Sequence, residues 1–176
     1  MLLRKINAVI SLLITFLLMD HSIFMGAWML SKGSIPQNAS MLPRFLFILM
    51  MVHAIMCIVM GIRAHKGTEK GKYNGYSKMN VPTYIQRISG VILIIFTTLH
   101  VLGASGVMQP PLFIHAVVPV LFFALSLMHV AVSASKAFIT LGIGTAKFVK
   151  VVDIVVKIIC CATLIADVVG FYLYKL

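Results

Sequence analysis

Five long apolar runs constrain the fold of this chain more than any other feature. They cover residues 6–30, 43–62, 88–108, 112–135 and 151–174. A membrane's hydrocarbon layer is about 30 Å thick and takes roughly 20 apolar residues per helical crossing, a length that these runs reach. Because 61% of the 176 residues are hydrophobic and only 11% are charged, the composition excludes an ordinary soluble domain. The sequence predicts an all-α membrane protein, with a single five-helix transmembrane domain over residues 1–176.

The basic residues predict how the helices are oriented. If the N-terminus is cytoplasmic, only Lys32, Arg44 and Lys175 fall on the outer face, and all other Lys and Arg residues fall on the cytoplasmic face. Cytoplasmic loops of membrane proteins carry such an excess of positive charge, so we expect the N-terminus inside and the C-terminus outside. The net charge of +11 therefore does not indicate nucleic-acid binding. A basic inner face also suits an acidic soluble partner, although anionic lipid favours the same bias.

The segments between the runs predict the topology. The outer connections, residues 31–42 and 109–111, are short, so the first four runs should form an up-and-down bundle. The inner connection 64–84 is polar and rich in Gly and Lys, which indicates a solvated loop. The second inner stretch, residues 136–150, is half apolar and contains Gly142 and Gly144. It should be a short interfacial helix or a turn on the membrane surface.

Four histidines lie inside the first four runs, one in each: His21, His53, His100 and His129. Ionisable groups at membrane depth are costly, and they usually face a cavity, a cofactor or each other. A single histidine of this kind is readily explained as a hydrogen bond between helices. Four histidines distributed one per helix point instead to a bound group. His65 and His115 lie near the membrane surfaces and are not expected to be ligands.

Depth divides the four histidines into two levels. At 1.5 Å rise per residue, His21 and His100 lie about 20 to 25 Å from the cytoplasmic ends of their runs, measured from Arg4 and Arg87. His53 and His129 lie about 10 to 15 Å in, measured from Arg63 and Lys136. We therefore expect the pairs His21 with His100 and His53 with His129.

Two bis-histidine b-type haems, one above the other, explain this pattern, because a porphyrin iron takes one axial imidazole from each side. Zinc is the competing metal for these histidines, but it needs a third and a fourth donor at the same depth. Methionine is a further axial ligand, yet it is also an ordinary gap-filler in apolar cores. Small residues near the histidines would give a porphyrin room, or would simply let helices pack closely. They are Gly26, Gly61, Gly90, Gly103, Ala124, Ser126 and Ser133.

Two carboxyl groups lie in the outer halves of their runs. Asp20 directly precedes His21 and would either exchange protons with a quinone or bond a neighbouring polar group. Asp167, in the fifth run, has the same two interpretations, or else only approaches the membrane surface.

With these helices and histidines, the chain resembles the five-helix, dihaem cytochrome b anchor of succinate:quinone oxidoreductases, which are the succinate dehydrogenases and fumarate reductases. The most specific stretch is Gln86-Arg87-Ile88-Ser89-Gly90, followed by an apolar run to Leu99-His100. Other matching stretches are Leu127-Met128-His129, Val52-His53-Ala54 and Met19-Asp20-His21.

The resemblance implies an electron-transfer subunit of a respiratory enzyme in a bacterial or archaeal cytoplasmic membrane. Its partners would be an iron-sulfur subunit and a flavoprotein subunit on the cytoplasmic side. Its lipid substrate would be menaquinone or another quinone, and whether the complex forms a dimer stays open. His53 and His129 would hold the haem nearer the iron-sulfur subunit. Arg87 and Ser89 resemble residues near a haem propionate or quinone, although they would also serve to start a helix at a charged interface.

One position departs from the family. Some fumarate reductases of this type carry a proton-conducting glutamate two residues before the fourth ligand, and here that residue is Leu127. Two rival functions stay open. One is the cytochrome b subunit of a hydrogenase, formate dehydrogenase or other flavin reductase. The other is a proton-coupled transporter with buried histidines.

Overall fold

The computed structural model describes residues 2–31, 41–65, 81–104, 107 and 112–175. Five helices account for nearly all of them: α1 (Leu2–Leu30), α2 (Met41–His65), α3 (Val81–Ala104), α4 (Leu112–Leu141) and α5 (Ala146–Lys175). Each contains a segment long and apolar enough to cross a membrane. The described residues contain no strand. The predictions of an all-helical chain and of five spanning helices are confirmed.

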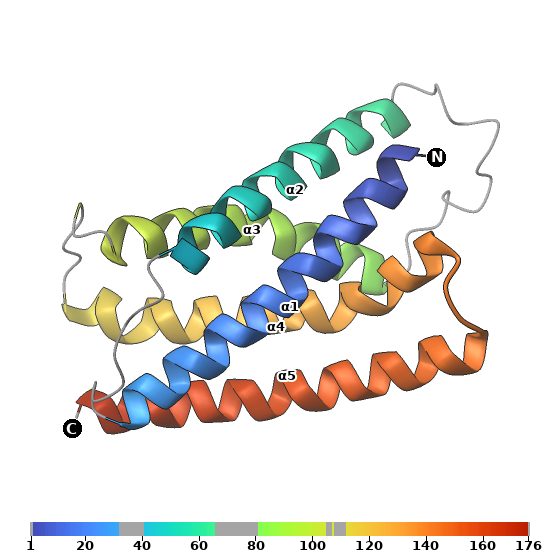
Figure 1. The fold of residues 1–176 in the computed structure, drawn as a ribbon. Coiled ribbons are helices and arrows are strands. Elements are labelled where there is room, and N and C mark those ends of the chain that lie inside the picture. The colour runs from blue at the N-terminus through green and yellow to red at the C-terminus, as the bar shows by residue number, and fades with distance from the viewer. Residues whose placement is uncertain (1, 32–40, 66–80, 105–106, 108–111, 176) are drawn as a thin grey trace.

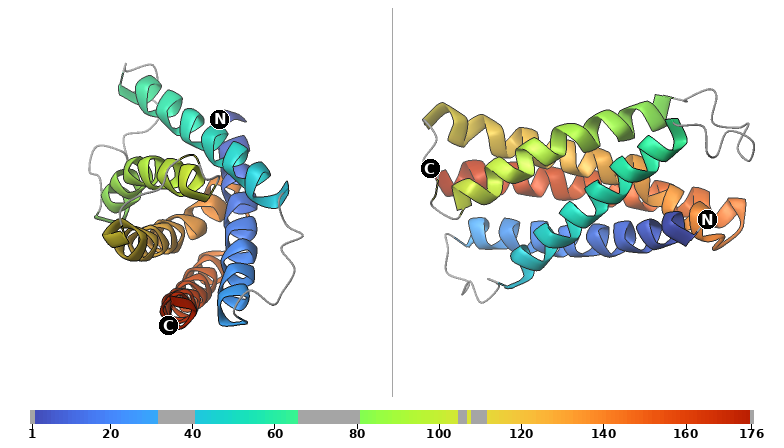
Figure 2. Two further views of the ribbon diagram at one scale, coloured as in Figure 1. Left: turned by 90° about the vertical axis from the view of Figure 1, so that its left-hand side faces the viewer. Right: turned by 90° about the horizontal axis from the view of Figure 1, so that it is seen from above.

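The first four helices lie around a common interior, and α5 lies beside them (Figure 1; Figure 2). α1 packs against α2 and α4, and α3 packs against α4 and, less extensively, against α2. α1 and α3 therefore lie diagonally across the interior from each other, as do α2 and α4. α5 packs against α1 and α4 and closes that side of the bundle.

A small apolar cluster holds the helices together. Its fully buried members come from α1, α2, α4 and α5: Ile14, Leu18, Leu46, Leu127, Val130 and Cys160. Many other apolar side chains face outward, among them Phe16 at 70% exposure. A soluble monomer rarely exposes so much contiguous apolar surface. In lipid that surface carries no penalty, and van der Waals packing between helices provides the association.

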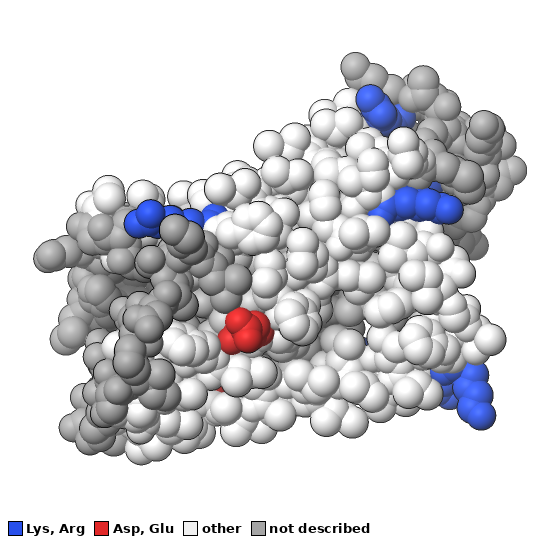
Figure 3. Space-filling model, viewed as in Figure 1, with Lys and Arg blue, Asp and Glu red and all other residues white. Residues whose placement is uncertain are grey.

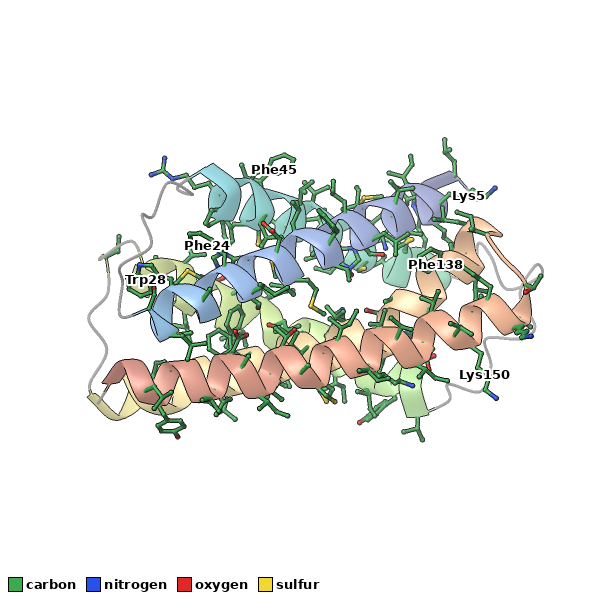
Figure 4. All side chains as sticks on the ribbon, turned by 60° about the horizontal axis from the view of Figure 1, so that its bottom comes forward. Lys5, Phe24, Trp28, Phe45, Phe138 and Lys150 are labelled. Atoms are coloured by element: carbon green, nitrogen blue, oxygen red, sulfur yellow. The ribbon has the colours of Figure 1, made fainter. Side chains whose placement is uncertain are left out.

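The two ends of the bundle differ in their side chains. Lys5 and Lys150 lie at one end, and Trp28 and Phe45 lie at the other (Figure 4). We call these the basic end and the opposite end. Basic side chains are confined to the ends of the face seen in Figure 3, while one acidic patch lies between them. The chain begins at the basic end and finishes at the opposite one (Figure 1).

Helix boundaries at the basic end differ from those expected. α3 begins at Val81 rather than at residue 88, and α4 continues to Leu141. The short interfacial helix considered for 136–150 is therefore wrong, and a tight turn joins α4 to α5. Gly142 and Gly144 adopt positive φ angles of 72° and 86° in this turn. The expected loop over 64–84 lies mostly outside the described residues.

Local hydrogen bonds explain why the two helices end and begin at this turn. The N–H groups of Gly142 and Ile143 donate to the carbonyls of Ile139 and Phe138, at 3.1 Å each, which is the Schellman pattern at a helix C-terminus. Thr145 then caps α5, because its hydroxyl oxygen accepts a hydrogen bond from the Phe148 N–H at 3.3 Å.

Candidate cofactor site

The four intramembrane histidines lie on four different helices, and each is partly buried. His21 of α1 and His100 of α3 are close enough for their charges to interact, and the same holds for His53 of α2 and His129 of α4. Since α1 and α3 form one diagonal of the bundle and α2 and α4 the other, each pair spans the interior. These are the two pairs expected from the sequence.

The helix boundaries place the members of each pair at matching depth. His21 lies 19 residues after the start of α1, and His100 lies 19 residues after the start of α3. His53 and His129 each lie 12 residues before the ends of α2 and α4 at the basic end. Measured along their own helices, His21 and His100 therefore lie about 28 Å from the helix ends on the basic side, and His53 and His129 lie about 18 Å from them.

A serine fixes the orientation of His129. The Ser89 hydroxyl lies 2.9 Å from His129 Nδ1 and 2.7 Å from the carbonyl oxygen of Ile85. The hydroxyl has one proton, which it donates to the Ile85 carbonyl, so we infer that it accepts the Nδ1–H of the imidazole. That tautomer leaves Nε2 with its lone pair. A metal-binding histidine is typically held in this way, with its other ring nitrogen donating to a fixed acceptor.

Gly90 provides space beside the same imidazole. A Cβ atom added there would lie 3.2 Å from His129 Cε1, so a larger residue would press on the ring. The other glycines expected to make room near histidines behave differently. Gly26 faces Asp167, and Cβ atoms at Gly61 and Gly103 would meet no described atom within 4 Å. Among these glycines, only Gly90 lies against a histidine.

Arg87 and Ser89 occupy different environments, although they are two residues apart. Ser89 is 1% exposed and Arg87 is exposed. Neither starts α3, which begins at Val81, so the expectation that they only initiate a helix is wrong. Nearby, the Lys136 ammonium of α4 donates to Gln86 Oε1 at 2.8 Å, and also to a threonine hydroxyl of α3. This link joins α3 to α4 on the basic side of His129.

The histidine pair nearer the opposite end, His21 and His100, has an aromatic neighbour. His100 stacks on Phe122 of α4, with the ring centroids 4.9 Å apart and an angle of 20° between the planes. Phe122 is itself buried, so it holds the His100 ring from the α4 side. Sequence reasoning missed this contact and the Lys136 link, because both depend on how α3 and α4 are rotated about their axes.

Several interior polar atoms are buried without a described hydrogen-bond partner: His53 Nδ1, Thr97 Oγ1 and Ser126 Oγ, together with both Asp167 carboxylate oxygens. Unpaired buried polar atoms are uncommon in proteins and call for an explanation. His53 Nε2 lies 3.6 Å from the Cys57 thiol on its own helix. α2 is also loosely packed, since Leu46 is its only described residue that is fully buried.

In the described part of the chain, no three His, Cys, Asp or Glu side chains converge as a metal-binding group. Zinc needs such a convergence, whereas a porphyrin iron needs only two opposed axial ligands. Each histidine pair offers two such ligands, and Gly90 lies against the His129 ring. His65 and His115 lie outside the described side chains.

Asp20 and Asp167, the acidic residues near His21 and His100, differ in burial. Asp20 is exposed on α1 and interacts electrostatically with His21. Asp167 is 1% exposed and faces Gly26 of α1. The interpretation that Asp167 approaches the membrane surface stays a prediction. Comparisons of the chain with protein-family models, curated proteins and solved structures give no match.

Proposed function

We propose that this chain is a dihaem cytochrome b that anchors a succinate dehydrogenase or fumarate reductase and passes electrons between menaquinone and an iron-sulfur subunit. The observation that carries the proposal is the pairing of four histidines across both diagonals of the bundle, with the His53 and His129 pair nearer the basic end. When bound, haem would supply one-electron transfer between these levels. His21 and His100 would hold one haem, and His53 and His129 the other.

The surroundings of the histidines support this assignment. Ser89 contacts His129 Nδ1, so Nε2 is the ring nitrogen that would bind iron, and Gly90 gives the ring room. The Lys136 ammonium and the exposed Arg87 lie on the basic side of His129, where they suit the negatively charged propionates of a haem. The stretch from Gln86 to Gly90, on which the family resemblance depends most, supplies three of these residues, Arg87, Ser89 and Gly90.

The basic end would face the cytoplasm, following the usual excess of positive charge on that side. An iron-sulfur subunit with its flavoprotein would dock there, nearest the His53 and His129 level. Quinone would react near the opposite end, beside His21 and Asp20. The dicarboxylate chemistry would belong to the flavoprotein and not to this chain.

A visible spectrum of the purified protein tests the proposal. We expect strong haem absorption that sharpens on reduction, and a haem content of two per chain. A colourless protein with intact helices would reject the cytochrome and favour the histidine transporter. Identification of the co-purified subunits separates a succinate or fumarate enzyme from a hydrogenase or formate dehydrogenase, because these differ in their soluble partners.

Ser89→Ala should weaken the haem held by His53 and His129. Loss of a group that orients a metal-binding histidine typically costs about 10 to 100-fold in metal affinity. Haem retention during detergent titration, followed by absorbance, measures the effect. Ser133→Ala is the matched control, since the Ser133 hydroxyl donates to the His129 backbone carbonyl at 2.6 Å and not to the ring. Equal haem loss in the two variants would contradict the role assigned to Ser89.

Asp20→Asn should slow quinol oxidation while both haems stay bound. Quinol oxidation releases protons, and Asp20 is the carboxyl adjacent in sequence to a proposed ligand of the opposite-end haem. Turnover with a soluble quinol analogue and the reduced spectrum are measured together. Asp153→Asn is the control, because Asp153 forms an ion pair with Lys157 in the part of α5 nearer the basic end. Normal turnover of Asp20→Asn would remove this carboxyl from the mechanism.

A further inference from the structure

Asp167 is a carboxyl group enclosed between two helices at membrane depth. It lies on α5, eight residues before the end of that helix at Lys175, which corresponds to about 12 Å of helix. Its side chain is 1% exposed, and neither carboxylate oxygen has a hydrogen-bond partner among the described residues. Asp167 belongs to no ion pair in the described part of the chain.

Small residues of α1 enclose this carboxyl. A Cβ atom at Gly26 would lie 3.0 Å from Asp167 Oδ1, so only glycine leaves the carboxyl its present space. One turn earlier on α1, the buried Ser22 hydroxyl faces the carboxyl without reaching good hydrogen-bond geometry. A Cβ atom at Gly170 would lie 3.4 Å from the Gly26 carbonyl oxygen, which reflects how closely α1 and α5 approach here.

Three successive residues of α1 connect this enclosed carboxyl to the proposed quinone side of the bundle. Asp20 is exposed, His21 interacts with His100 across the interior, and Ser22 is buried facing α5. Successive side chains on a helix point about 100° apart, so Asp20, His21 and Ser22 face three different surroundings. Ser22 and Asp167 therefore lie at the level of the His21 and His100 pair.

An ionised carboxylate in these surroundings would be costly. A charge in the apolar interior of a membrane protein is costly, and it is normally paired. Asp167 has no paired cation and no hydrogen-bond donor of good geometry among the described residues. A neutral carboxyl avoids this cost of charge.

We propose that Asp167 is a proton-exchange site, protonated at rest, that passes protons between a quinol near His21 and the aqueous phase at the opposite end. This rests on the proposed function. Oxidation of one quinol yields a quinone, two electrons and two protons. For each of the two protons in turn, Asp167 releases its proton to the aqueous phase, and its carboxylate then takes a proton from a quinol hydroxyl by way of Ser22. The electrons leave separately toward the basic end.

Infrared spectroscopy of the purified chain tests the resting state. The chain has only four Asp and Glu residues, so a carboxyl band is readily assigned by substitution. We expect a protonated-carboxyl C=O band at neutral pH that shifts in D₂O, disappears in Asp167→Asn and persists in Asp153→Asn. Gly26→Ala should shift the band, whereas Gly61→Ala should not, since a Cβ atom at Gly61 meets no described atom within 4 Å. Absence of the band, or its survival in Asp167→Asn, would overturn the proposal.

Proton release tests the exchange step in vesicles that hold the chain in one orientation, with a reduced naphthoquinone outside and ferricyanide trapped inside as electron acceptor. We expect Asp167→Asn to slow proton release at least tenfold, with haem content unchanged, and Ser22→Ala to slow it less. Unchanged release would overturn the relay alone. A wild-type chain that binds no haem would instead overturn the proposed function, and the relay with it.

Discussion

Leucine in place of His53 or His129 should remove the haem nearer the basic end and leave the other haem bound. Leucine in place of His21 or His100 should have the reverse effect. The members of each pair lie on opposite sides of the interior at the same depth, and the axial bonds to iron are local. Haem content should fall from two per chain to one in every case, and the four variants should give two distinct spectra.

Variants of the two pairs should also differ in function, because only the haem at the basic end would face the iron-sulfur subunit. His53→Leu and His129→Leu should block reduction of the remaining haem by the iron-sulfur subunit, while His21→Leu and His100→Leu should leave the basic-end haem reducible. Each variant must first be shown to insert in the membrane, and His65→Leu serves as the control at the end of α2. If His21→Leu matched His53→Leu rather than His100→Leu, the arrangement of the haems in two levels would be refuted.

The sequence predicted the spanning helices well, because an apolar run long enough to cross a membrane has few alternatives to a helix in lipid. It predicted the helix boundaries at the basic end poorly. Residues 81–87 and 136–141 are partly polar, so hydropathy alone stops short of them, yet both continue helices. Gly142 and Thr145 were the available signals, since glycine ends helices at positive φ and threonine caps them.

The sequence could suggest which histidines lie near each other, but not the contacts around them. Constant helical rise gives each histidine a depth, and the structure brings together the members of the two expected pairs. Contacts such as Ser89 with His129 and Gly26 with Asp167 depend on how each helix is rotated about its axis. Rotation is set by packing, and outward-facing apolar residues in lipid leave little amphipathic pattern from which to predict it.

Quinol oxidation by this protein should generate a membrane potential, positive on the quinone side. Electrons would move from the quinone side to the basic end, and the protons would be released where the quinol reacts. A compensating proton path would have to pass between the two histidine levels. Leu127 lies there at 3% exposure, within the apolar cluster that contains Leu18 and Val130. That position offers neither a carboxyl nor a polar neighbour in the cluster, so we expect one charge displaced per electron transferred.

A potential-sensitive dye in proteoliposomes measures this displacement, and an uncoupler should accelerate turnover. Leu127→Glu places a carboxyl at the apolar position, and Leu127→Gln is its control of nearly equal size that cannot release a proton. If proton conduction at this position decides the coupling, the Glu variant should build a smaller potential than the Gln variant at equal haem content. Oxidation by the wild-type protein without charge displacement would mean that protons cross the bundle by another route. The unpartnered hydroxyls of Thr97 and Ser126 would then be the first groups to substitute.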